Sequence, residues 1–86
     1  MKQILNFING EYKASDKTFE KRSPVTGTVI AHVHEASAKD VDEAVKAAHA
    51  ALNGPWGRMT VAERVDRLYA LVDGINRRFD EFVAAE

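Results

Sequence analysis

The spacing of hydrophobic positions changes part of the way along the chain. Residues 4–34 alternate apolar and polar side chains over short runs separated by turn-forming residues, which is typical of β-strands. Residues 38–86 instead repeat apolar side chains at intervals of three and four, the spacing of one helix face. The pattern therefore predicts strands over about 5–34 and helices over about 38–53 and 60–86, an α+β arrangement of β hairpins followed by two helices.

A tight hairpin is predicted near the start of the chain. The run 5–8 is followed by Asn9 and Gly10 and then by Glu11 and Tyr12. Asn-Gly readily adopts the two positive φ values of a type I′ turn, so the flanking runs are expected to pair as antiparallel strands.

A second strand pair is predicted over residues 18–22 and 28–33. Between them, Pro24 sets φ for a turn and Gly27 accommodates a left-handed backbone. Alternation places one set of side chains on an apolar face, namely Val29, Ala31 and Val33. The opposite face is mixed and carries Thr28, Ile30, His32 and His34.

The first helix has clear start and stop signals. Ser37 and Asp40 form a capping-box-like start, and Gly54 with Pro55 ends the helix, within a loop predicted at 53–57. Its apolar stripe is mostly alanine and comprises Val41, Ala44, Val45, Ala48 and Leu52. Small side chains allow close approach of another element but bury little area each.

The second helix begins with another capping box, Thr60 and Glu63. Its apolar side chains recur in steps of three and four at Val61, Val65, Leu68, Val72, Ile75, Phe79 and Phe82, widened by Leu71 and Val83. The other side is charged and carries Arg64, Asp66, Arg67, Asp73, Arg77, Arg78, Asp80 and Glu81. This predicts one long amphipathic helix, which Gly74 weakens by about 1 kcal/mol relative to alanine.

The helical pattern continues to Glu86 without a glycine, asparagine or polar tail to close the last turn. A natural terminus that frays is the alternative. The β segments also lack enough partners to cover both faces and their edges. We therefore expect residues 1–86 to be an incomplete domain, the front part of a larger protein.

Composition narrows the classes of partner. Twelve basic and thirteen acidic residues leave a net charge of −1, which favours neither nucleic acid nor an anionic membrane. The sequence has no cysteine, so these residues offer no disulfide, thiolate ligand or thiol nucleophile. No run approaches the roughly 18 apolar residues of a membrane span. A cytoplasmic setting is expected.

Several residues invite a chemical role, and each has a simpler interpretation. His32 and His34, two apart on one strand face, suit a metal ion. With no third ligand nearby, exposed polar residues on a solvent face are the favoured interpretation. His49 lies off the apolar stripe of the first helix, and we interpret it as a surface histidine.

A group of arginines on the second helix suggests phosphate binding, namely Arg64, Arg67, Arg77 and Arg78. Because acidic residues alternate with them, a solvated or salt-bridged helix face is favoured. The hydroxyl and carboxyl groups at Ser15, Asp16, Ser23 and Thr26 are interpreted as turn formers. Trp56 is interpreted as a loop anchor packed on the helices. No phosphate loop or Ser-His-Asp set is found, so no catalytic, cofactor-binding or metal residue is assigned.

Five segments follow one another in a distinctive order: FINGEY at 7–12, SPVTGTVI at 23–30, AKDVDEAVKAA at 38–48, PW at 55–56 and AER at 62–64. In this succession they resemble the N-terminal region of the aldehyde dehydrogenase superfamily over nearly the entire chain. Ser23 departs from the asparagine that many relatives carry, which affects turn geometry more than chemistry.

The resemblance implies a parent enzyme that oxidises an aldehyde to a carboxylate with NAD and assembles as a homo-oligomer. A cysteine nucleophile, a glutamate base and the nucleotide motifs would all follow residue 86. Residues 1–86 would then be the N-terminal, outer portion of the NAD-binding domain, with no cofactor bound to them alone. Some relatives hold a monovalent cation on backbone carbonyls near Lys21 and Arg22, but the completing carboxylate would lie beyond Glu86.

Three functional hypotheses follow. The first is a catalytically silent part of a dehydrogenase, whose partner is the remainder of that chain. The second is a stand-alone α+β interaction module that docks through the amphipathic second helix. The third is a small metal- or phosphate-binding protein that uses His32 and His34 or the arginines.

Overall fold

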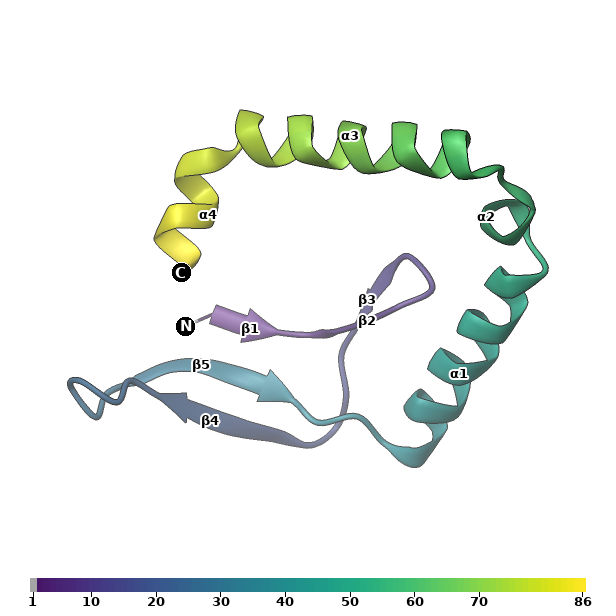
Figure 1. Cartoon of the computed structure of the whole chain (residues 1–86). Coiled ribbons are helices and arrows are strands. Elements are labelled where there is room, and N and C mark those ends of the chain that lie inside the picture. Colours follow the sequence, from purple (N-terminus) through teal and green to yellow (C-terminus); the bar gives the residue numbers. More distant parts are fainter. Residues whose placement is uncertain (1) are drawn as a thin grey trace. The chain divides into compact units, whose positions relative to one another are not determined.

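The computed structural model describes residues 2–86, and its elements follow the predicted order of strands and then helices (Figure 1). The strands are β1 (Lys2–Ile4), β2 (Asn6–Ile8), β3 (Glu11–Lys13), β4 (Thr18–Arg22) and β5 (Val29–His34). The helices are α1 (Ala38–Leu52), α2 (Pro55–Arg58), α3 (Val61–Arg77) and α4 (Phe79–Ala85). The predicted α+β class is confirmed. The chain divides into two compact units, residues 1–50 and 51–86.

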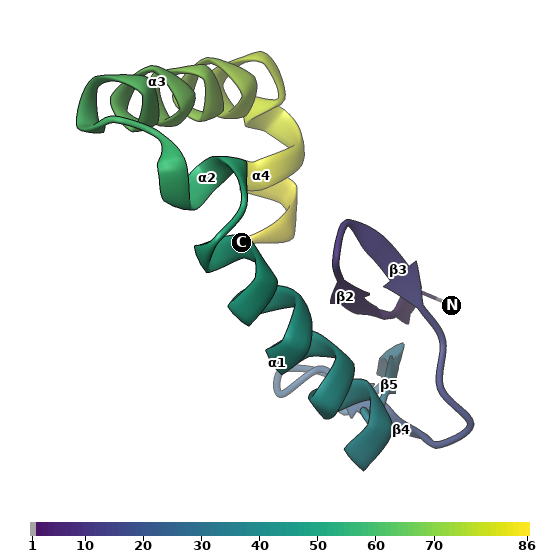
Figure 2. The same ribbon diagram turned by 90° about the vertical axis from the view of Figure 1, so that its right-hand side faces the viewer.

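The first hairpin forms as predicted (Figure 2). β2 and β3 pair antiparallel, with Phe7 opposite Tyr12. Asn9 and Gly10 take φ values of 51° and 81°, the positive angles that the turn requires. The Phe7 and Tyr12 rings are 4.9 Å apart between centroids, a cross-strand aromatic contact that supports this register.

A mixed sheet has the strand order β1-β5-β4 (Figure 1). β4 and β5 pair antiparallel as predicted, whereas β1 runs parallel to β5. The sequence interpretation missed β1, because three residues show no usable alternation and their partner lies far along the chain. Leu5 separates β1 from β2, so one extended segment changes its partner at this residue.

The turn between β4 and β5 is closed by backbone hydrogen bonds. Ser23 N–H donates to Thr28 O at 2.8 Å, and Gly27 N–H donates to Ser23 O at 2.8 Å. Gly27 has the predicted positive φ, 75°. The pairing of the two strands shifts its register between Lys21 and Arg22.

Little of the first unit is buried. Among the described residues, the buried hydrophobic side chains are Ile8 and Ala31, at 8% and 3% exposure. Ala31 lies on the predicted apolar face of β5, where Val29 and Val33 are half-buried. The apolar face is therefore confirmed, although these strands bury only a small core.

The start of α1 is a reciprocal cap. Asp40 N–H donates to Ser37 Oγ at 3.2 Å, and Ser37 N–H donates to Asp40 Oδ2 at 2.9 Å. The Ser37 hydroxyl also donates to Asp40 Oδ2 at 3.0 Å. The two hydrogen bonds that the carboxylate accepts from Ser37, from its backbone N–H first and then from its hydroxyl, lower the pKa of Asp40 from its ordinary value. Further along, Lys13 of β3 and Glu43 of α1 form an ion pair at 3.2 Å, which ties the hairpin to the helix.

The predicted loop at 53–57 contains a short helix, α2. Gly54 is the N-cap residue of α2, and Pro55 follows it in the first turn. The missing N–H of proline costs no hydrogen bond there, because the first N–H groups of a helix have no partner within the helix. The loop interpretation is therefore wrong for residues 55–57, which belong to α2. The sequence pattern predicts Pro55 as the end of the first helix, whereas in the structure it also begins the next helical turn.

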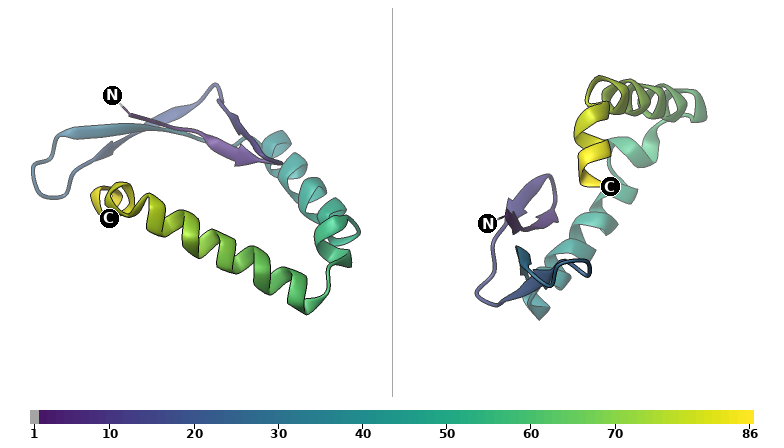
Figure 3. Two further views of the ribbon diagram at one scale, coloured as in Figure 1. Left: turned by 90° about the horizontal axis from the view of Figure 1, so that it is seen from above. Right: turned by 90° about the vertical axis from the view of Figure 1, so that its left-hand side faces the viewer.

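The predicted helix 60–86 is two helices. Thr60 and Glu63 form the expected capping box at the start of α3. The break is at Arg78, with φ −115° and ψ 28°, and α4 turns away from the axis of α3 (Figures 1 and 3). The hydrophobic spacing does not distinguish one continuous helix from two helices separated at Arg78. Only one residue leaves the helical conformation, so the spacing of the apolar residues stays intact.

The apolar stripe of α3 and α4 comprises Val61, Val65, Leu68, Leu71, Val72, Ile75, Phe79, Phe82 and Val83. Neither helix has a buried residue within its described range. Leu68, Phe79 and Phe82 are 55%, 58% and 50% exposed. Large hydrophobic side chains thus lie open along both helices.

Candidate functional site

A hydrogen-bonded chain of polar side chains joins three segments of the first unit. Gln3 of β1 pairs in register with His32 of β5, and its Nε2 lies 3.3 Å from His32 Nδ1. Its Oε1 lies 2.9 Å from His34 Nε2. The other ring nitrogen, His34 Nδ1, lies 2.9 Å from Ser15 N and 3.2 Å from Ser15 O. His34 thereby connects β1 to the loop before β4.

The donors in this chain fix where the protons lie. The Gln3 amide nitrogen donates to His32 Nδ1, so Gln3 Oε1 accepts from His34 Nε2–H. His34 Nδ1 is then free to accept from the Ser15 N–H. Both imidazoles are half-buried, so the prediction that they stand exposed on a solvent face is wrong. Gln3 and Ser15, which contact the two imidazoles, lie far from them in the sequence, and the strand pattern therefore does not reveal these contacts.

Ser15 does not form a nucleophile–base pair with His34. Its backbone contacts the imidazole, whereas its hydroxyl donates to Lys17 O at 3.2 Å. Ser23 is likewise a turn former, because its Oγ accepts from Val25 and Thr26 N–H at 3.3 and 3.4 Å. Both interpretations as turn residues are confirmed.

Two further predicted residues are exposed or line open space. His49 is exposed on α1, in agreement with its interpretation as a surface residue. Asp16 lines a polar cavity of about 440 Å³. The cavity is formed by the loop before β4 and the start of α1, and its lining residues are Ala14, Ser15, Asp16, Lys17, Glu35, Ala36, Ser37 and Asp40. Its acidic side chains do not combine into a metal site, because residues 2–86 hold no suitable group of three or more His, Asp or Glu.

A mostly apolar groove of about 370 Å³ runs between β2 and α1. Its lining residues are Asn6, Phe7, Ile8, Ala36, Asp40, Val41, Ala44, Val45 and Ala48. The buried Nδ2 of Asn6 has no hydrogen-bond partner within the described part of the chain. The alanine-rich face of α1 is therefore open where another element can pack.

Arg64 is a structural residue and not part of an arginine cluster. Its guanidinium lies 5.5 Å from the centroid of the Trp56 ring, a cation–π contact. Its Nη2 also donates to Trp56 O at 3.2 Å and to Gly57 O at 3.4 Å. Trp56 thus anchors α2 to α3, as its interpretation as a loop anchor requires.

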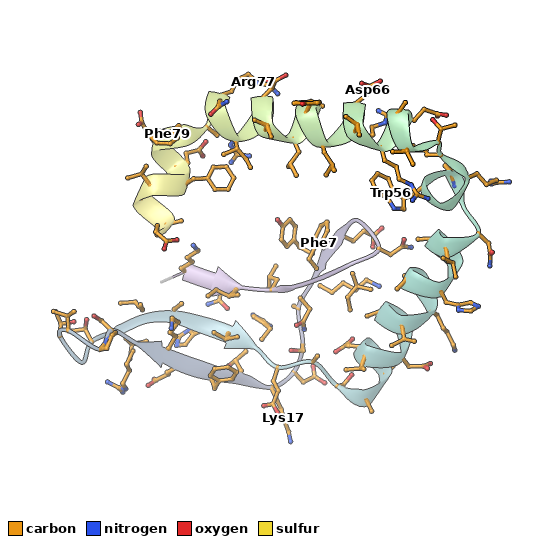
Figure 4. All side chains as sticks on the ribbon, in the orientation of Figure 1. Phe7, Lys17, Trp56, Asp66, Arg77 and Phe79 are labelled. Atoms are coloured by element: carbon orange, nitrogen blue, oxygen red, sulfur yellow. The ribbon has the colours of Figure 1, made fainter. Side chains whose placement is uncertain are left out.

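Arg77 and Arg78 lie apart from Arg64. Arg77 is at the end of α3 that lies away from Trp56 of α2, which Arg64 contacts (Figure 4). Arg78 pairs with Glu81, with Nε to Oε2 at 2.6 Å and Nη2 to Oε1 at 3.1 Å, and this hydrogen bond lowers the pKa of Glu81. The favoured interpretation of a solvated, partly salt-bridged face is confirmed for this residue.

The described residues contain no paired nucleophile and base among the candidates above. The sequence has no thiol, and the one serine beside a histidine uses its backbone. No helix between residues 2 and 86 is long and apolar enough to cross a membrane. The site can position strands and loops, and it offers imidazole nitrogens as ligands.

The chain belongs to the aldehyde dehydrogenase family, whose sequence pattern matches residues 12–86. It is 56% identical to a 2-hydroxymuconic semialdehyde dehydrogenase of Pseudomonas sp. (strain CF600), over 100% of this chain and 18% of the relative. A Pseudomonas putida protein of the same name is 55% identical over 99% of this chain and 18% of its own. A Pseudomonas 2-aminomuconic 6-semialdehyde dehydrogenase is 49% identical, with 100% and 18% covered. The chain spans about a fifth of the length of these relatives.

Proposed function

We propose that these 86 residues are the N-terminal portion of the NAD-binding domain of a cytoplasmic, NAD-dependent 2-hydroxymuconic semialdehyde dehydrogenase. The parent enzyme would oxidise the semialdehyde to a dicarboxylate in the meta-cleavage breakdown of aromatic compounds. The observation that carries the proposal is 56% identity over the full chain to a protein of that name. Residues 31–37 and 74–79 carry much of this finer resemblance.

The chain itself would be catalytically silent. A thiolate nucleophile is required for the proposed oxidation, and this sequence has no cysteine. Its role would be to cover other parts of the dehydrogenase. The open stripe of α3 and α4 and the groove beside α1 supply apolar surface for that packing. The partner would be the remainder of a dehydrogenase chain, and the parent would be a homo-oligomer.

Fragment complementation tests the proposal. The 86-residue chain is co-expressed with the Pseudomonas sp. (strain CF600) relative from which the matching N-terminal residues have been deleted. We expect no NADH from either piece alone and NADH formation from 2-hydroxymuconate semialdehyde when both are present. Turnover by the 86-residue chain alone, or failure of the two pieces to restore activity, would contradict the proposal.

Two charge substitutions make a matched control. Leu68→Asp places a carboxylate in the apolar stripe, whereas Arg67→Asp places one beside it on the charged side of the same helix. We expect Leu68→Asp to abolish complementation and Arg67→Asp to retain it. Equal effects of the two would show that the stripe does not mediate the packing.

The exposed stripe also favours a second candidate, a stand-alone interaction module that docks through α3. A module of this kind folds on its own and binds its partner as a monomer or dimer. Sedimentation and circular dichroism distinguish the two functions. A well-folded chain that does not complement the truncated dehydrogenase would favour the module.

A further inference from the structure

We propose that His32 and His34 form a binding site for a borderline divalent transition-metal ion, such as Cu²⁺ or Zn²⁺. The site lies on the sheet face shared by β1 and β5 and is independent of the proposed dehydrogenase function. Imidazole nitrogens are common ligands for these ions.

The two imidazoles share one hydrogen-bond partner. His32 Nδ1 and His34 Nε2 lie 3.3 and 2.9 Å from the two ends of a single amide group, that of Gln3. The histidines are two apart on β5, so their side chains project to the same side of the strand. The Gln3 side chain is long and exposed, and it can move aside. An ion that takes the place of this amide would therefore lie between both rings, and the two histidines are the ligands that we propose for it.

The loop before β4 already supplies the support that a ligating histidine requires. A metal on His34 Nε2 displaces the proton from that nitrogen to Nδ1. Nδ1 accepts from Ser15 N–H at 2.9 Å and lies 3.2 Å from Ser15 O. The relocated N–H can donate to Ser15 O once the Ser15 N–H turns away from this nitrogen. A backbone carbonyl in this place fixes the tautomer and orientation of metal-bound histidines in general.

The surroundings of the pair are compatible with a cation. Glu20 of β4 is opposite His32 in the strand register, and it brings a carboxylate to this part of the sheet. Its Oε2 is held by Arg22 Nη2 at 2.8 Å, so we do not count it as a ligand. Two protein nitrogens with the remaining positions taken by water give an open site. Affinity should follow the general order for nitrogen ligands, Cu²⁺ above Ni²⁺ above Zn²⁺, and hard Mg²⁺ should not bind.

Calorimetric titration of the 86-residue chain with CuCl₂, NiCl₂, ZnCl₂ and MgCl₂ tests the site. We expect one saturable equivalent of Cu²⁺. His32→Asn or His34→Asn should weaken binding at least tenfold, because one of the two ligands is lost. His49→Asn is the matched control, since it removes a histidine from the exposed face of α1, and it should leave the affinity unchanged.

A measurement on the unsubstituted chain guards against variants that fail to fold. Substoichiometric Cu²⁺ should broaden the NMR signals of His32 and His34 before those of His49. Absence of saturable binding, equal broadening of all three histidines, or tight binding retained in the His32 and His34 variants would overturn the proposal.

Discussion

Two glycines of the second unit have opposite surroundings. A Cβ at Gly57 would overlap the backbone carbonyl of Leu52 and lie 3.3 Å from Ala51 O, so the turn between α1 and α2 needs a glycine. A Cβ at Gly74 would meet only the end of the Arg77 side chain, at 3.7 Å. The first glycine is required by close backbone approach, and the second is not.

We therefore predict that Gly57→Ala and Gly74→Ala change stability in opposite directions. Gly57→Ala should cost about 1–3 kcal/mol, because backbone on both sides must shift. Gly74→Ala should stabilise α3 by about 1 kcal/mol through its higher helix propensity. Urea unfolding followed by circular dichroism measures both. A Gly57→Ala variant that is more stable than the Gly74→Ala variant would show that the turn between α1 and α2 is not packed as described.

The Ser37–Asp40 cap gives α1 a defined response to acid. Hydrogen bonds from Ser37 lower the pKa of Asp40 below its ordinary 3.8 in the folded chain, so the unfolded chain binds the proton more tightly. The stability that ionised Asp40 contributes to the folded chain is therefore fully present above the ordinary pKa. It is lost as the pH falls through the lower pKa of the folded state. We expect the Ser37 amide signal to follow this titration in NMR, and Asp40→Asn to remove it. A midpoint above 3.8 would contradict the assignment.

Arg64 of α3 contacts α2 and so stabilises the junction between these two helices. Arg64→Met should loosen this junction by about 1–2 kcal/mol, from the lost cation–π contact and the hydrogen bonds to Trp56 O and Gly57 O. Trp56 is the single tryptophan, so its fluorescence reports the change directly, as a shift to longer wavelength. Arg67→Met, on the same helix, should leave the emission unchanged. Equal emission shifts in the two variants would show that the change does not come from the contact between Arg64 and Trp56.

The elements that could be predicted from sequence are those with local causes. Asn9-Gly10 specifies the first hairpin, and the capping pairs Ser37–Asp40 and Thr60–Glu63 mark the starts of α1 and α3. β1, by contrast, exists because it pairs with β5, whose sequence is far away. The α3–α4 break at Arg78 leaves the hydrophobic repeat intact, so periodicity does not reveal it.

In the candidate site, too, the features with local causes could be predicted, and those that depend on residues far apart in the sequence could not. The spacing of His32 and His34 identified the pair, because residues two apart on a strand share a face. Their half-buried state and common hydrogen-bond partner were missed, since Gln3 lies on an unpredicted strand and Ser15 on a loop. The assignment of these 86 residues to the NAD-binding domain stays a prediction.

The open apolar surface should govern how the isolated chain behaves. Because Leu68, Phe79 and Phe82 are all at least half exposed, we predict self-association or marginal stability in solution. Sedimentation and thermal unfolding over a concentration series measure this. Leu68→Asp should reduce self-association, and Arg67→Asp should not. A sharp, concentration-independent transition of a monomer would contradict the prediction.

The most direct test of the account is backbone hydrogen exchange along α3, measured in the 86-residue chain alone and in its complex with the truncated relative. If the stripe is covered by the rest of a dehydrogenase, amides near Leu68 and Val72 exchange rapidly in the isolated chain and slowly in the complex. Identical exchange in both samples, or full protection in the isolated chain, would show that α3 needs no such cover.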